Sequence, residues 1–136
     1  MEFFVSGKPQ GKARPRFSRR SGHTYTPQKT VDYESRIREA FLEAGGEKLE
    51  RNCYVSVSVT AYFPIPQSWP KIKRAWAEER IIEPGVKPDA DNILKAVLDA
   101  LNGVAYEDDS QVILVKVWKT YSTTPGLRIT VGEHKE

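Results

Sequence analysis

The stretch "KPDADNILKAVLDALNGVAYEDDSQV" runs from Lys87 to Val112 and determines how the middle of the chain folds. Its apolar residues between Ile93 and Leu101 recur at helical spacing, and this pattern predicts a helix from Asp91 to Leu101. The "NGV" that follows ends this helix. The next regular element is a strand in "QVILVKVWKTY", so the stretch predicts a helix followed by a strand.

The remaining elements are predicted from periodicity and turn residues. They are an opening strand in "FFVSG", a helix from Thr30 to Glu43, an alternating strand from Tyr54 to Ala61, a short helix or ordered loop in "SWPKIKRAWAEERI", and a strand in "GLRITVGE". The last strand is expected to pair with "QVILVKVWKTY" across the "STTPG" turn. We therefore predict a single α+β domain over residues 1–136, with one mixed β-sheet backed by helices and a closing β-hairpin.

Composition limits the class of protein. The chain has 136 residues, 39% of them apolar, which suits one globular domain with a single core. It has no apolar run long enough to cross a membrane and no signal-peptide pattern, so we expect a cytoplasmic protein without a membrane partner. Cys53 is the only cysteine, which excludes an internal disulfide and a thiolate metal cluster.

Charge is divided unevenly along the chain. Residues 1–30 carry seven Lys/Arg against Glu2, a net of +6, and the rest carries fourteen Lys/Arg against seventeen Asp/Glu, a net of −3. This asymmetry favours a basic surface for a polyanion, with DNA as the first candidate. The DNA-contacting candidates are the basic residues of the glycine- and proline-rich segment after the first strand, and one lysine before the acidic stretch: Lys8, Lys12, Arg14, Arg16, Arg19, Arg20 and Lys87.

The basic segment "KPQGKARPRFSRRSGHTYTPQ" has no apolar period and is predicted to be a long loop. Its arginines would contact phosphates, and Phe17 and Tyr25 are available to stack on an unpaired base. The alternative is a flexible, solubilising loop without a partner.

The acidic residues Asp89, Asp91, Asp108 and Asp109 have two competing explanations. Aspartates at a helix start can cap free N–H groups, and a charged helix face can simply be solvated. The alternative is a divalent metal site: the helix rises about 15 Å, and eight residues of extended chain span up to about 26 Å, so the second pair can return to the first. Such carboxylates suit Mg²⁺ or Mn²⁺, and Lys95, one turn beyond Asp91, could then contact a phosphate.

Other acidic motifs fit poorly. An EF-hand loop beginning at Asp89 would need glycine at its sixth position and glutamate at its twelfth, which here are Leu94 and Ala100. The chain also has no nucleotide-binding glycine-rich loop.

Taken together, "KPDADNILKAVLDAL" and "EDDSQV" resemble the RusA family of Holliday junction resolvases, also called crossover junction endodeoxyribonucleases. The matching pattern is Asp-x-Asp-Asn, a lysine four residues beyond the second aspartate, and a downstream Asp-Asp-x-Gln. The resemblance implies a RusA-like fold and a homodimeric, magnesium-dependent endonuclease that cuts four-way DNA junctions by paired nicks in recombination and repair. By motif position, it implies that Asp89, Asp91 and Asp109 bind metal and that Lys95 is the essential lysine.

Two further interpretations stay open at this point. One is a related metal-dependent nuclease that acts on flaps, forks or other branched DNA. The other is a noncatalytic junction-binding module whose carboxylates only cap and solvate a helix. The pattern also leaves open whether Asp108 shares or replaces the role of Asp109.

Overall fold

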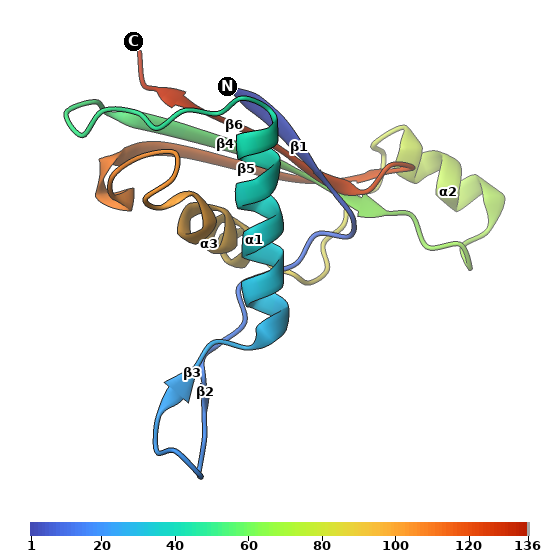
Figure 1. The fold of residues 1–136 in the computed structure, drawn as a ribbon. Coiled ribbons are helices and arrows are strands. Elements are labelled where there is room, and N and C mark those ends of the chain that lie inside the picture. The colour runs from blue at the N-terminus through green and yellow to red at the C-terminus, as the bar shows by residue number, and fades with distance from the viewer. Residues whose placement is uncertain (136) are drawn as a thin grey trace.

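The computed structural model describes residues 1–135, and its centre is a four-stranded sheet with the strand order β1-β6-β4-β5 (Figure 1). The sheet strands are β1 (Glu2–Ser6), β4 (Val55–Pro64), β5 (Val112–Ser122) and β6 (Gly126–Glu133). The helices are α1 (Gln28–Glu43), α2 (Lys71–Glu78), α3 (Ala90–Leu101) and the short 3-10 helix η1 (Asp109–Gln111). Strands β2 (Arg16–Phe17) and β3 (Thr24–Tyr25) form a separate ribbon.

Strand β4 shows how the core forms. Its alternation places Val55, Val57 and Val59 on the buried face, while the serines and threonine between them are half-buried on the other face. The same buried face carries Ile129 of β6, which lies directly beside Val59. Helices α1 and α3 cover this face and pack against each other, so the core lies between the sheet and these two helices.

Pairing in the sheet is mixed, as predicted. Strand β4 runs parallel to β5 and antiparallel to β6, and β6 runs antiparallel to β1. The predicted α+β domain with one mixed sheet backed by helices is therefore confirmed. The parallel connection from β4 to β5 passes through α2 and α3, as a crossover between parallel strands requires.

The predicted closing β-hairpin is wrong. Strands β5 and β6 are not neighbours, because β4 lies between them. Residues 123–125 carry the chain past the end of β4, a step of two strand spacings or about 10 Å. Three linking residues can span that distance as easily as they close a hairpin, so the turn sequence does not distinguish the two connections.

The segment predicted as a long loop contains the ribbon of β2 and β3, which projects away from the sheet (Figure 1). Each strand has two residues, too few for any periodicity to be recognised. Helix α2 lies at the opposite end of the molecule, beyond the ends of β4 and β5 (Figure 1). Among the helices within residues 1–135, none is long and apolar enough to cross a membrane.

Candidate functional site

The start of α3 presents two of the predicted carboxylates to solvent. Asp89 occupies the N-cap position and Asp91 lies in the first turn, and both are exposed. The side chain of Asp89 makes no capping hydrogen bond, and its carboxylate lies 3.4 Å from the ammonium of Lys87. Capping through a side-chain hydrogen bond therefore does not account for Asp89.

Further along α3, the polar stripe separates into a free cation and a paired anion. Lys95 is exposed, and it makes no salt bridge with any residue in the described part of the chain. Asp99, one turn later, lies 3.1 Å from the ammonium of Lys12. The stripe thus leaves Lys95 available to an external anion.

Asp108 and Asp109 have different surroundings, although the sequence alone does not show which of the two is the better candidate for metal binding. Asp108 accepts a hydrogen bond from the Ser110 hydroxyl, and this bond is the main cause that lowers the pKa of the Asp108 carboxyl. Desolvation opposes this effect and is the second-largest cause, while the backbone N–H groups of Ser110 and Asp109 and the charge of Arg51 lower the pKa further. Asp109 is exposed at the first position of η1, with no side-chain hydrogen bond within residues 1–135. Asp108 thus stabilises the turn, whereas Asp109 presents a free carboxylate.

The side chain of Gln111 stabilises the turn formed by the Asp-Asp-x-Gln residues. Its side-chain oxygen accepts hydrogen bonds from the backbone N–H groups of Glu107 and Asp108, at 2.9 and 3.1 Å. Its amide nitrogen donates to the carbonyls of Glu50 and Cys53, at 2.9 and 3.0 Å. The glutamine therefore fixes the acidic turn to the loop that precedes β4.

Tyr106 connects the acidic turn to α3. Its buried hydroxyl donates a 2.8 Å hydrogen bond to the carbonyl of Leu98, in the third turn of the helix. Burial raises the pKa of this hydroxyl, and the negative charges of Asp109, Asp99 and Asp108 raise it further. The second acidic pair therefore returns toward α3.

A metal ion at this site would have to be held by carboxylate oxygens. Within residues 1–135, no three Asp, Glu, His or Cys side chains converge as a ready set of metal ligands. The donor chemistry still fits: Asp89, Asp91 and Asp109 are exposed oxygen donors of the kind that Mg²⁺ and Mn²⁺ prefer. The assignment of these three as metal ligands stays a prediction.

A basic groove of about 460 Å³ lies beside Asp89, between the loop after β1, the start of α1 and the start of α3. Its charged lining residues are Lys8, Lys12, Lys29, Lys87 and Asp89. Sequence reasoning did not place Lys29 in the site. Lys29 follows Pro27 and Gln28 at the start of α1, and this position is the sequence feature that could have indicated its place in the groove.

Close contact holds the loop after β1 against α3. A Cβ atom on Gly11 would lie 3.0 Å from the Cβ atoms of both Asn92 and Pro88, so glycine allows the approach. The next residue, Lys12, donates its backbone N–H to the carbonyl of Asn92 at 3.0 Å. This loop forms the wall of the groove opposite Asp89.

Lys12 is paired rather than free. Its ammonium lies 2.7 Å from Glu34 of α1 and 3.1 Å from Asp99 of α3. Burial by itself would lower the pKa of Lys12, but the hydrogen bonds and charges of these two carboxylates outweigh it and raise the pKa. Lys12 therefore joins the two helices, and Lys8, Lys29 and Lys87 are the exposed lysines of the groove.

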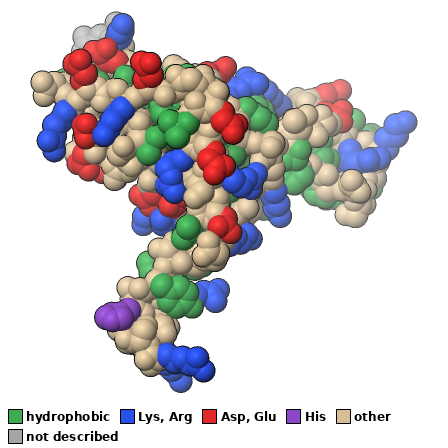
Figure 2. Space-filling view, viewed as in Figure 1, with side chains coloured by type: hydrophobic (Ala, Val, Ile, Leu, Met, Phe, Trp, Pro, Cys, Tyr) green, Lys and Arg blue, Asp and Glu red, His purple; other side chains and the backbone are tan. Residues whose placement is uncertain are grey.

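The ribbon carries the other predicted DNA contacts. Figure 2 shows Lys and Arg side chains gathered at its tip, away from the body of the molecule. Arg14, Arg16, Arg19 and Arg20 are all exposed. Phe17 and Tyr25 are 62% and 50% exposed, far more than a structural role in a core would leave.

The sequence of the chain places it in a class of DNA hydrolases. The family model described as "Endodeoxyribonuclease RusA" matches residues 6–132, so the chain belongs to that family. Membership indicates endodeoxyribonuclease activity and supports a Holliday junction resolvase nuclease that acts on branched DNA. The chain is also 36% identical over 137 residues to "Uncharacterized protein YqaN" of Bacillus subtilis (strain 168), covering 98% of this chain and 96% of that relative.

Proposed function

We propose that this protein is a magnesium-dependent endonuclease that resolves four-way junctions by paired nicks, as a homodimer, in DNA recombination and repair. One observation carries the proposal: the exposed carboxylates of Asp89 and Asp91 lie at a helix start beside a groove lined by lysines. A site that joins carboxylates with a surface for a phosphate backbone suits phosphodiester hydrolysis. A nuclease of this kind would act in the cytoplasm, and Mn²⁺ would be an alternative cofactor.

Each side chain has a role in this proposal. Asp89, Asp91 and Asp109 would hold the divalent metal, which when bound lowers the pKa of water and neutralises phosphate charge. Lys95 contacts a non-bridging oxygen of the phosphate and stabilises charge as it develops. Lys8, Lys29 and Lys87 hold the DNA backbone in the groove, and the ribbon arginines contact phosphates further along the duplex.

The outer edge of β5 supports the dimer. From Val112 to Val117 this edge has no strand neighbour within residues 1–135, and Ile113, Leu114 and Val115 are 53%, 42% and 41% exposed. Open apolar edges promote pairing with another chain. Two identical strand edges can pair antiparallel about a two-fold axis, so a second copy of this chain fits the edge. The resulting dimer would match the two-fold symmetry of a junction.

The C-terminal part of β5 is covered from within the chain. Glu83 accepts 2.8 Å hydrogen bonds from the Trp118 indole and the Thr120 hydroxyl, and Lys119 donates to the carbonyl of Val86. This coverage limits the open part of the edge to the half that follows Asp109.

A substrate panel tests the proposal. The full chain should cut a synthetic four-way junction in Mg²⁺ and not in EDTA, and it should cut a linear duplex of the same sequence at least about 100-fold more slowly. Equal cutting of flaps, forks and junctions would replace the resolvase with a broader branched-DNA nuclease. Binding without cutting in both Mg²⁺ and Mn²⁺ would leave a junction-binding module.

A further inference from the structure

A second hollow, largely apolar and unused in the proposed function, adjoins the groove at Asp89. It has a volume of about 490 Å³ and lies at the ends of β4 and β5. Its apolar walls are Phe63, Ile65, Trp69, Val86 and Tyr121. We refer to it as the aromatic pocket.

The aromatic pocket shares two cations with the groove. Lys8 and Lys87 line both hollows, and Asp89 lies two residues beyond Lys87 and lines the groove. A phosphate held between these lysines would therefore have a carboxylate on one side and the aromatic pocket on the other. The nucleotide attached to that phosphate has its base within reach of the pocket.

The walls of the aromatic pocket are held in place by specific contacts. The rings of Trp69 and Tyr121 meet edge to face with centroids 5.4 Å apart, and the Lys73 ammonium lies 4.1 Å from the Trp69 ring centroid. The ammonium of Lys119 lies 5.2 Å from the Phe63 ring centroid and donates to the carbonyl of Val86. The pocket is thus built from rings that are fixed before any ligand arrives.

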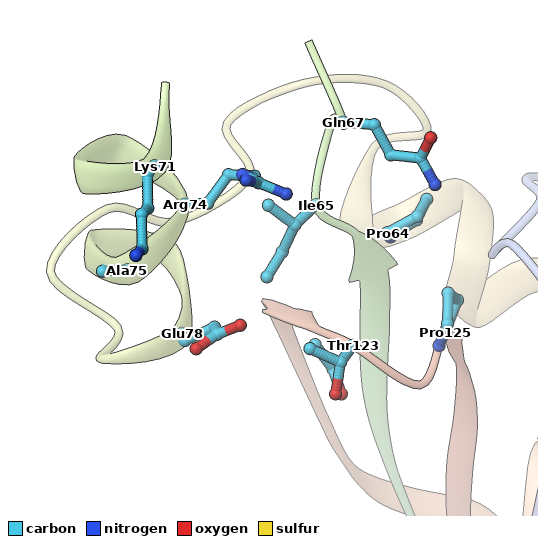
Figure 3. Close-up of a pocket in the computed structure, with 10 residues that line it drawn as sticks. Pro64, Ile65, Gln67, Lys71, Arg74, Ala75, Glu78, Thr123 and Pro125 are labelled. Carbon is cyan, nitrogen blue, oxygen red and sulfur yellow. The ribbon is translucent and has the colours of Figure 1, made fainter. Parts of the chain in front are cut away.

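A neighbouring hollow of similar size, which shares Pro64, Ile65 and Gln67 with the aromatic pocket, provides a contrast (Figure 3). It measures about 540 Å³, is lined by Lys71, Arg74 and Glu78, and has no aromatic ring in its lining. Ser122, Thr123 and Pro125 line it from the end of β5 and the connection to β6, whereas Phe63, Trp69 and Tyr121 line the aromatic pocket and not this hollow. Of these two adjoining hollows, the one next to the groove at Asp89 therefore has the aromatic walls.

We propose that the aromatic pocket receives one unstacked nucleobase, from the nucleotide next to the phosphate held by Lys8 and Lys87. This inference rests on the proposed function and adds to it a base-binding site at the branch point. Aromatic and apolar walls suit the face of any base, and the lysines at the rim suit its phosphate. In an open four-way junction the central base pairs have a stacking neighbour on one side only, so removing one of their bases costs less than in a linear duplex.

Fluorescence of 2-aminopurine tests the pocket directly, because this base brightens when it leaves the stack. Junctions carrying 2-aminopurine at successive positions around the branch point are mixed with the Asp91→Asn variant of the whole chain, which we expect to bind them without cutting. We expect a several-fold increase at one position next to the cut site. This scan keeps the pocket residues unaltered, so it does not depend on how a pocket variant folds.

A matched pair of substitutions locates the bright base. Val86→Trp fills the aromatic pocket from an exposed position, whereas Ala75→Trp, also at an exposed position, fills the neighbouring hollow without aromatic walls. Val86→Trp should abolish the fluorescence increase and slow junction cleavage at least tenfold, with junction affinity within threefold of wild type. Ala75→Trp should leave all three within twofold.

Three results would overturn the pocket. The first is a scan in which no position brightens although the wild-type chain binds and cuts junctions. The second is the same fluorescence and cleavage for Val86→Trp and Ala75→Trp. The third is loss of the fluorescence increase in Phe17→Ala but not in Val86→Trp. The last result would place the base on the ribbon. Failure of the wild-type chain to bind any branched DNA would overturn the proposed function as well, and is distinguished by that loss of binding.

Discussion

At the scale of single residues, the neighbours Asp108 and Asp109 differ in what they contact. The hydrogen bond from Ser110 ties Asp108 to its own turn, while Asp109 faces solvent. Sequence spacing alone does not distinguish the two carboxylates, because nothing in "EDDSQ" indicates which one forms a hydrogen bond within its own turn. The motif-based choice of Asp109 as a metal ligand stays a prediction, and it requires a carboxylate that is not tied to its own turn.

This difference predicts opposite effects of two amide substitutions. Asp109→Asn should lower cleavage at least about 100-fold and leave the melting temperature unchanged. Asp108→Asn should keep cleavage within a few-fold and lower the melting temperature at neutral pH. Thermal melts and single-turnover cleavage of both variants check this, and the reverse pattern would assign the metal to Asp108.

The pH dependence of the Asp108 effect follows from the sign of its shift. Because folding lowers the pKa of this carboxyl below its ordinary value of 3.8, the charged form stabilises the fold above that value. The contribution is lost as pH falls through the folded pKa. The difference in melting temperature between wild type and Asp108→Asn should therefore shrink in acid, and a difference that grew below pH 3.8 would refute the account.

Lys12 shows what the sequence could not reveal. It was predicted as a DNA contact from the charge of its segment, but its partners Glu34 and Asp99 lie far along the chain on different helices. Such a pairing depends on tertiary packing. By contrast, Asp91 and Lys95 lie on an exposed face of α3, as their spacing of four predicts, because helical spacing is a local property. Their catalytic roles stay a prediction.

Lys12→Met should therefore destabilise the fold. We expect the free energy of unfolding to fall by about 1–2 kcal/mol, because Glu34 and Asp99 lose their shared partner in a partly buried setting. Ion pairing raises the pKa of Lys12, so its contribution persists below the ordinary value of 10.5 and disappears as pH rises through the folded pKa. Lys8→Met, at an exposed lysine of the same groove, is the control for urea titrations and should change stability little.

At the scale of elements, the projecting ribbon is the clearest candidate for a DNA-contacting arm. Replacing Arg16 and Arg20 with alanine should weaken junction binding and reduce the slope of log affinity against log salt by about 1.8. A matched double substitution, Lys71→Ala with Arg74→Ala, removes two exposed charges from α2 and should leave the slope unchanged. Equal slopes for the two double variants would mean that the ribbon is only a solubilising segment.

Elements also show where sequence reasoning stops. Helices α1 and α3 and strand β4 were predicted to within a few residues, because each carries a strong local period. The hairpin failed because strand pairing is a long-range choice: β6 inserts between β1 and β4, and no residue of "STTPG" encodes that neighbour. The pattern gave the strands but not their order.

At the scale of the whole molecule, the two-fold account depends on the β5 edge. The wild-type chain should have twice its 15.4 kDa mass in multi-angle light scattering. Replacing Ile113 and Val115 with lysine should give the monomer mass, because charged side chains on an open edge oppose strand pairing. Leu42→Lys, at an exposed apolar position on α1, is the control and should stay dimeric. A wild-type monomer at micromolar concentration would contradict the two-fold account.

The most direct measurement is cleavage of a supercoiled plasmid that extrudes a cruciform, in Mg²⁺ or EDTA, by the wild type and Asp91→Asn. Paired nicks across one four-way junction give linear plasmid, whereas single nicks give only relaxed circles. The account predicts linear product with wild type in Mg²⁺ alone, and unbroken plasmid with Asp91→Asn although it still binds the cruciform. Linear product in EDTA, or undiminished cutting by Asp91→Asn, would contradict the proposed metal-dependent resolvase site.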